Sequence, residues 1–149
     1  MMTTPSTSEA LEVQGKIAAK PATVFPFLSD GAKMALWFGT TAEIQAKPGG
    51  HLRVDINGRD IAAGEVVEVV ADQRIVFTFG WEGEGHPIPP GSSKVEITLA
   101  EDGDGTLVRL RHTGLPAEAA KDHKDGWVNY MPRLAAVVEG RDPGPNPHP

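Results

Sequence analysis

Residues 117–140 read AEAAKDHKDGWVNYMPRLAAVVEG, and they carry the clearest helical pattern in the chain. One stripe takes every third or fourth residue and consists of His123, Trp127, Tyr130, Met131, Leu134 and Val138. The opposite side is polar and holds Glu118, Asp122, Asp125, Asn129 and Arg133. At about 3.6 residues per turn, this spacing predicts one amphipathic helix. Because the stripe includes an imidazole, an indole and a phenol, it would also present polar groups to the surface that it covers.

The chain before this helix has the two-residue period of β-strands. Apolar and polar residues alternate over 9–19, 42–46, 51–56, 61–70, 74–81, 94–99 and 106–113. Turn sequences separate them: Lys47-Pro48-Gly49-Gly50 predicts a type II turn, and Asn57-Gly58 predicts a type I′ hairpin. Strands joined one after another by such turns form an antiparallel sheet.

Two short helices are predicted after the first strand, over 21–28 and 31–38. Pro21 suits a first helical turn, whereas Pro26 makes the first of these helices short or distorted. With its helices separated from an antiparallel sheet, the chain is predicted to be an α+β protein. A long amphipathic helix lying across a curved sheet would enclose a cavity between them.

Size and composition limit the class of protein. The 149 residues fit one domain, which we expect over 9–140, with a disordered tail at 1–8 and a Pro/Gly-rich disordered tail at 141–149. The absence of cysteine excludes disulfides, thiolate metal sites and cysteine nucleophiles. A net charge of -6 argues against binding to nucleic acid or to anionic membranes. Without a signal peptide in residues 1–8 or an apolar run near the ~20 residues of a membrane helix, we expect a cytoplasmic protein.

Several short sequences, taken in order, resemble a known family. They are Pro21-Ala22-Thr23-Val24-Phe25, Trp37-Phe38, Pro48-Gly49-Gly50, Gly64-Glu65-Val66, Arg74-Ile75-Val76-Phe77-Thr78-Phe79, Trp81, Gly105-Thr106, His112-Thr113-Gly114-Leu115, Gly126-Trp127 and Leu134. Over 11–140 the chain resembles a helix-grip, START-like domain of the SRPBCC superfamily. Within it, the chain is most similar to homologues of the activator of the heat-shock protein 90 ATPase.

This resemblance implies a seven-stranded antiparallel sheet that grips the C-terminal helix, with a cavity between them. Relatives bind lipids, sterols, plant metabolites or polyketides, some are cyclases or aromatase-like enzymes, and some are chaperone partners. The fold therefore does not select a function. The chain departs from the pattern at Pro132, which predicts a kink in the helix because proline lacks the amide hydrogen and clashes with the preceding turn.

The candidate ligand-binding residues come from both walls of the predicted cavity. They are Trp37, Phe79, Trp81, His112, His123, Trp127, Tyr130, Met131 and Leu134. The strand phase of His112 turns it toward the helix, where it would face His123. The two imidazoles are interpreted either as a ligand-binding or acid–base pair, or as structural histidines whose nitrogens are hydrogen-bonded. The aromatic residues are interpreted either as ligand-stacking walls or as core.

Signatures of catalysis are missing from the chain. It has no nucleophile elbow, zinc-protease motif, phosphate loop or dinucleotide fingerprint, so we predict no catalytic residue, no metal and no cofactor. His86, in the long loop 80–93 beside Glu82 and Glu84, is interpreted as part of a solvated loop or of a mobile lid.

Three hypotheses follow for the function. The first is a non-catalytic binding module for a small hydrophobic or aromatic molecule. The second is a co-factor of a heat-shock protein 90 type chaperone or another protein-interaction domain. In each case we expect a monomer or homodimer. The third is a polyketide cyclase- or hydrolase-like enzyme that uses His112, His123 or Tyr130 for proton transfer.

Overall fold

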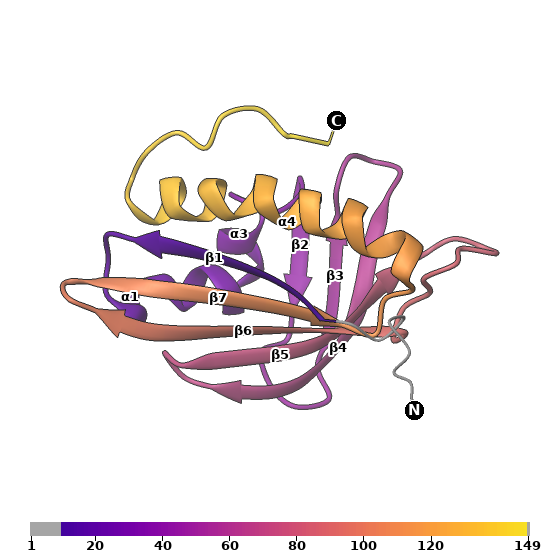
Figure 1. The fold of residues 1–149 in the computed structure, drawn as a ribbon, viewed down its shortest axis with the longest axis horizontal. Coiled ribbons are helices and arrows are strands. Elements are labelled where there is room, and N and C mark those ends of the chain that lie inside the picture. The colour runs from indigo at the N-terminus through magenta and orange to yellow at the C-terminus, as the bar shows by residue number, and fades with distance from the viewer. Residues whose placement is uncertain (1–9, 149) are drawn as a thin grey trace, which may run out of the picture.

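The computed structural model describes residues 10–148, which form one antiparallel sheet with a long helix across one of its faces (Figure 1). The strands are β1 (Leu11–Ile17), β2 (Thr41–Ile44), β3 (His51–Asp55), β4 (Ile61–Val70), β5 (Arg74–Trp81), β6 (Ser93–Asp102) and β7 (Gly105–Thr113). They pair in the order β1-β7-β6-β5-β4-β3-β2. With the long helix α4 (Ala117–Val138), this arrangement confirms the α+β helix-grip prediction.

The inward face of the sheet follows from the alternation in each strand. In β7, Val108, Leu110 and His112 are buried, whereas Arg109 and Arg111 between them are exposed. Successive side chains of a strand point to opposite faces, so the sequence period alone turns His112 inward. The imidazole lies in the core with no exposed surface.

Three one-turn helices connect β1 to β2, where the sequence predicts two. They are α1 (Pro21–Val24), α2 (Pro26–Ser29) and α3 (Gly31–Met34). The predicted first helix is divided at Pro26, which begins a new helix because it has no amide hydrogen to continue the old one. The Asp30 side chain caps α3 by accepting the Lys33 amide hydrogen at 3.1 Å.

The turn between β3 and β4 differs from the predicted type I′ hairpin. Among the described residues, Gly58 has positive φ but Asn57 does not, and a type I′ turn needs positive φ at both. Side chains hold a longer loop instead: Asp55 accepts from the Gly58 amide at 2.6 Å, and Asn57 accepts from the Asp60 amide at 2.9 Å. The prediction of the turn type was therefore wrong, although the prediction of a hairpin was correct.

Helix α4 turns its aromatic stripe toward the sheet. Trp127, Tyr130, Met131 and Leu134 are all buried, and Trp127 is only 4 % exposed. The helix continues through Pro132 as one element of 22 residues. Within residues 10–148, no helix combines the length and the apolar character that crossing a bilayer requires.

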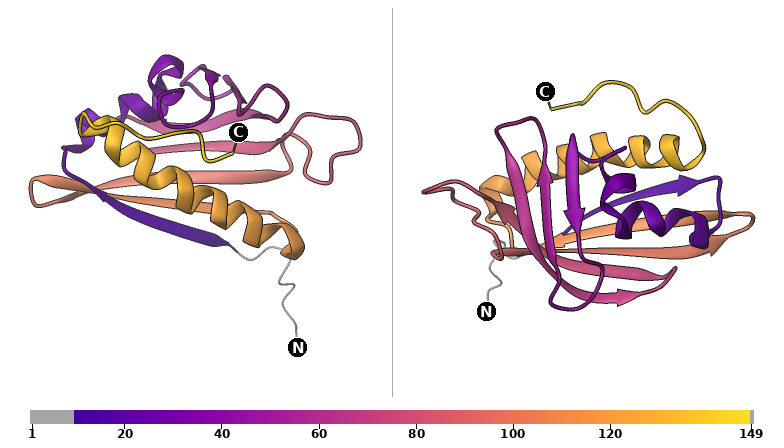
Figure 2. Two further views of the ribbon diagram at one scale, coloured as in Figure 1. Left: turned by 90° about the horizontal axis from the view of Figure 1, so that it is seen from above. Right: turned by 180° about the vertical axis from the view of Figure 1, so that it is seen from behind.

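The segment after α4 returns along the helix instead of leaving the molecule (Figure 2). One arginine binds it, because Arg133 Nη1 donates to the backbone oxygens of Pro143, Gly144 and Pro145 at 3.2, 2.7 and 2.8 Å. Asn146 Nδ2 then donates to the Ile56 oxygen at 2.9 Å. Hydrogen bonds from the Arg133 and Asn146 side chains to backbone oxygens therefore hold the segment 143–146 beside the rest of the molecule.

Candidate functional site

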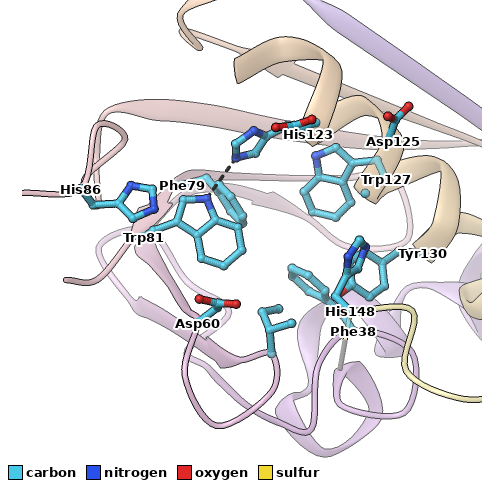
Figure 3. Close-up of a pocket in the computed structure, with 13 residues that line it drawn as sticks. Phe38, Asp60, Phe79, Trp81, His86, His123, Asp125, Trp127, Tyr130 and His148 are labelled. Carbon is cyan, nitrogen blue, oxygen red and sulfur yellow. Dashed lines mark hydrogen bonds between the residues drawn. The ribbon is translucent and has the colours of Figure 1, made fainter. Parts of the chain in front are cut away.

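An open cavity of about 480 Å³ lies between α4 and the sheet (Figure 3). Its walls are mainly aromatic and include Phe38, Phe79, Trp81, Trp127 and Tyr130. The rings pack against one another, with the Phe38 and Tyr130 centroids 4.9 Å apart and those of Phe79 and Trp127 5.8 Å apart. This volume lies within the range of about 300–1,000 Å³ that small-molecule sites occupy.

A chain of hydrogen bonds behind the cavity holds Trp127. The indole Nε1 donates to His112 Nδ1 at 3.0 Å, and His112 Nε2 lies 2.8 Å from Ser93 Oγ. Ser93 Oγ in turn donates to the Phe79 backbone oxygen at 2.7 Å. Since an indole can only donate, Nδ1 of His112 must accept, and Nε2 carries the hydrogen and donates to Ser93.

His112 is therefore a neutral imidazole with both nitrogens bonded. Burial, together with the neighbouring His123, lowers the pKa of His112 from 6.5 to about 3. A charged imidazole would lose the Trp127 bond and would have no water around it, so both the geometry and the desolvation favour the neutral form. The structure favours the interpretation of His112 as a structural histidine that orients Trp127.

His123 and Trp81 form a second, similar pair at the mouth of the cavity. Trp81 Nε1 donates to His123 Nε2 at 3.0 Å (Figure 3). His123 Nδ1 lies 2.9 Å from the Ala119 backbone oxygen. The hydrogen of His123 is then on Nδ1, bonded within α4. Because both indole N–H groups of the cavity are bonded to imidazoles, the tryptophans have only ring surface to offer a ligand.

Tyr130 and His148 each hold an unpaired polar atom of this site, the Tyr130 hydroxyl and His148 Nε2. The hydroxyl comes from α4. The Tyr130 side chain is 5 % exposed, and its hydroxyl is buried without a hydrogen-bond partner among the described residues. Burial raises the pKa of Tyr130 to about 12, with Arg133 opposing the shift. An unpaired buried hydroxyl costs about 1–3 kcal/mol, and a water molecule or a ligand atom at hydrogen-bond distance would remove this cost.

The C-terminal segment closes one side of the cavity. The His148 ring lies 5.3 Å from the Tyr130 ring, and Asn57 Nδ2 donates to the His148 backbone oxygen at 3.0 Å. His148 therefore forms part of the wall beside Tyr130 (Figure 3).

Five of the nine predicted ligand-binding residues line the cavity, namely Phe79, Trp81, His123, Trp127 and Tyr130. The other four lie outside its lining. Trp37 donates to the Phe27 backbone oxygen at 2.8 Å and stacks on Phe38, whereas Leu134 is core. Met131 packs over Gly15 of β1, and His112 supports Trp127 from behind.

Sequence reasoning missed the remaining lining residues, which are Phe38, Ile56, Asp60, His86, Asp122, Asp125, Gly126 and His148. His86 was interpreted as part of a solvated loop or of a lid, and its ring lies 6.2 Å from that of Trp81. Phe38 adjoins the predicted Trp37, so its place was the easiest to anticipate. Among residues 10–148, no group of three or more His, Asp or Glu side chains converges as a metal site would require.

The neutral state of His112 predicts a loss of stability in acid. Below pH 6.5 the unfolded chain gains a proton at this residue, and the native protein does not until about pH 3. Stability should therefore fall as the pH drops through this window, by about 2 kcal/mol at pH 5. Urea unfolding at pH 7 and pH 5 measures the loss, which should be much smaller in His112→Gln. A His112 imidazole that titrates near pH 6.5 by NMR in the native protein would contradict the prediction.

A helix crossing an antiparallel sheet, with an aromatic cavity between them, defines a helix-grip protein of the START-like class. A family model described as "Activator of Hsp90 ATPase homolog 1-like protein" matches residues 18–139. The chain belongs to this family. A comparison with curated proteins gave no match.

Solved structures share the fold. An AHSA1-like protein from Rhizobium etli is 42% identical, with a TM-score of 0.70 and coverage of 99% of this chain and 93% of that one. DynU16, from the dynemicin biosynthetic locus, is 24% identical with a TM-score of 0.79; the match covers 93% of this chain and only 50% of DynU16. The Aha1 dimer from Colwellia psychrerythraea is 15% identical, with a TM-score of 0.73 and coverage of 87% and 96%.

Proposed function

We propose that the protein binds a small apolar or aromatic molecule in the cavity between α4 and the sheet, without transforming it. The observation that carries this proposal is the buried, unpartnered hydroxyl of Tyr130 in a cavity whose walls are mainly aromatic. Ligand sites typically combine apolar walls with a few polar groups that fix orientation. A ligand oxygen or nitrogen beside Tyr130 would supply the missing hydrogen bond.

The hydrogen bonding of the histidines favours binding over catalysis. A general acid or base needs a ring nitrogen that can reach the substrate. In His112 and His123 both ring nitrogens are engaged by protein groups at 2.8–3.0 Å. An enzyme that used either histidine for proton transfer would therefore require its hydrogen bonds to break when substrate binds.

The chaperone hypothesis is the second candidate, because the family name refers to activation of the Hsp90 ATPase. A protein-docking surface usually contains a contiguous apolar patch. The exposed large apolar side chains here come from separate elements: Leu36 follows α3, Val67 and Val70 lie on β4, and Val128 lies on α4. Pull-down with purified Hsp90 tests this alternative directly.

The binding proposal is tested with a panel of small aromatic and aliphatic compounds. A compound at 100 times its Kd should add about 2.7 kcal/mol of stability, which raises Tm by about 5–10 °C. In spectra of the three tryptophan side chains, the indole signals of Trp81 and Trp127 should move, whereas that of Trp37, outside the cavity, should stay. Absence of any Tm or indole shift over a broad panel would count against the proposal.

Gly126 provides a variant that separates stability from binding. It lies within α4 and lines the cavity, and the atom closest to an added Cβ is His148 Nε2 at 3.9 Å. Gly126→Ala should stabilise the helix by about 0.5–1 kcal/mol. Gly126→Leu should keep most of this gain but fill the cavity and weaken binding by at least about tenfold, a change of 1.4 kcal/mol. Thermal unfolding and calorimetric titration of both variants measure the two effects. If Gly126→Leu bound the ligand as tightly as the wild type, the ligand site would not be this cavity.

A further inference from the structure

Apart from its three histidines, the charged side chains that line the cavity all have one sign. Asp60, Asp122 and Asp125 are among its lining residues, and no lysine or arginine is among those that the described chain contributes. The net charge of the whole chain, -6, has the same sign. A cleft lined by one sign of charge concentrates ligands of the opposite sign.

The aromatic walls add to this preference. The indole N–H groups of Trp81 and Trp127 are bonded to His123 and His112, so these donors are not free to bind an anionic group. What the rings can offer a ligand is their faces, where the quadrupole is negative. Aromatic faces attract ammonium groups, most strongly where water is excluded.

The Tyr130 hydroxyl supplies an acceptor in the same space. It is buried and unpartnered, and its ring extends from α4 toward His148 (Figure 3). Since burial raises its pKa to about 12, the phenol stays neutral and its oxygen lone pairs can accept an N–H hydrogen. This group indicates a ligand independently of the three aspartates.

Lys121 and Arg133 do not take the place of such a ligand. Lys121 pairs with Asp125 at 2.8 Å, but both side chains are exposed, and an exposed pair of this kind contributes little. Arg133 acts on Tyr130 from outside the lining, and its guanidinium is bound to the Trp37 oxygen and to the C-terminal segment.

We infer that the cavity selects ligands that carry a positively charged amine on an aromatic or aliphatic body. The body lies against the rings, the ammonium N–H bonds to Tyr130, and the aspartates at the rim attract the charge. The inference rests on the proposed function and specifies the chemical class of its ligand.

Three naphthalene compounds of similar size test it by calorimetric titration: naphthylmethylamine, protonated at pH 7, naphthylmethanol and naphthoate. The amine should bind at least about tenfold more tightly than the alcohol, and naphthoate should bind most weakly. Added salt should weaken binding of the amine alone. If the alcohol binds as tightly as the amine, charge selection is overturned while the binding proposal stands. If none of the three binds, the inference fails, and the broader panel decides the proposed function separately.

Variants of the protein locate the effect. The triple variant D60N/D122N/D125N should bring the affinity for the amine to that for the alcohol, and should leave the alcohol within about twofold of wild type. The matched control E43Q/E101Q/D104N removes as many acidic side chains from positions outside the lining and should keep the preference. Tyr130→Phe should weaken binding of the amine, because the hydroxyl that accepts its N–H hydrogen is lost. If the control variant also abolishes the preference for the amine, the preference comes from the net charge of the protein, and the proposed site is overturned.

Discussion

Replacing His112 with alanine is expected to lower the free energy of unfolding by about 4 kcal/mol. This cost combines the cavity left by the smaller side chain with a hydrogen-bond donor left without a partner. The imidazole has no exposed surface, so its removal leaves an internal void. It also accepts the Trp127 N–H at 3.0 Å, and that donor would then be buried without a partner. Typical domains have only about 5–15 kcal/mol of stability in total. Urea unfolding at pH 7 measures the loss.

Phenylalanine at this position separates the hydrogen bond from the volume. His112→Phe keeps a ring but leaves Trp127 Nε1 unpaired, so it should cost less than alanine, about 1–3 kcal/mol. The double variant His112→Phe/Trp127→Phe also removes the indole donor. Its total cost should be less than the sum of the costs of the two single variants. Strictly additive costs would mean that the Trp127–His112 hydrogen bond contributes nothing.

The sequence predicts the fold well because its signals are local. Alternation in residues 106–113 is enough to turn His112 inward, and the stripe of 117–140 is enough to turn Trp127 toward the sheet. Antiparallel strands joined by hairpins then leave little choice of neighbours. The same periodicity predicted five of the residues that line the cavity, because residues on the inner faces of helix and sheet must meet.

The rest of the site depends on pairings that no local pattern specifies. Trp81 and His123 are 42 residues apart, and their hydrogen bond exists only once α4 lies over the end of β5. The sequence interpretation placed the two imidazoles opposite each other and paired neither of them with an indole. His148 lies in a stretch whose composition is typical of a tail, and its position depends on long-range hydrogen bonds from Arg133, Asn146 and Asn57 to backbone oxygens.

A second large effect is expected at Gly80, where alanine should destabilise the protein by about 3 kcal/mol and change the mouth of the cavity. Gly80 is buried in β5, and a Cβ there would overlap the backbone of Pro89 and Pro90, which cannot rotate away as a side chain can. The loop 82–92 must then move outward. It would lose the burial of Ile88, now 4 % exposed, and the hydrogen bond from the Trp81 amide to the Ile88 oxygen at 2.7 Å.

Gly85→Ala in the same loop is the matched control. Gly85 has φ +75° but nothing within 4 Å of an added Cβ, so alanine there should cost only the strain of its conformation, about 1–2 kcal/mol. Trp81 should keep its environment in the control and lose it in Gly80→Ala, because the carbonyl of Ile88 and the ring of His86 both reach Trp81 from this loop. Urea unfolding gives the loss of stability in each variant, and the NMR signal of the Trp81 indole reports changes at the mouth of the cavity. If both variants left that signal unchanged, the loop would not form the rim, and ligand entry would have to depend on the C-terminal segment instead.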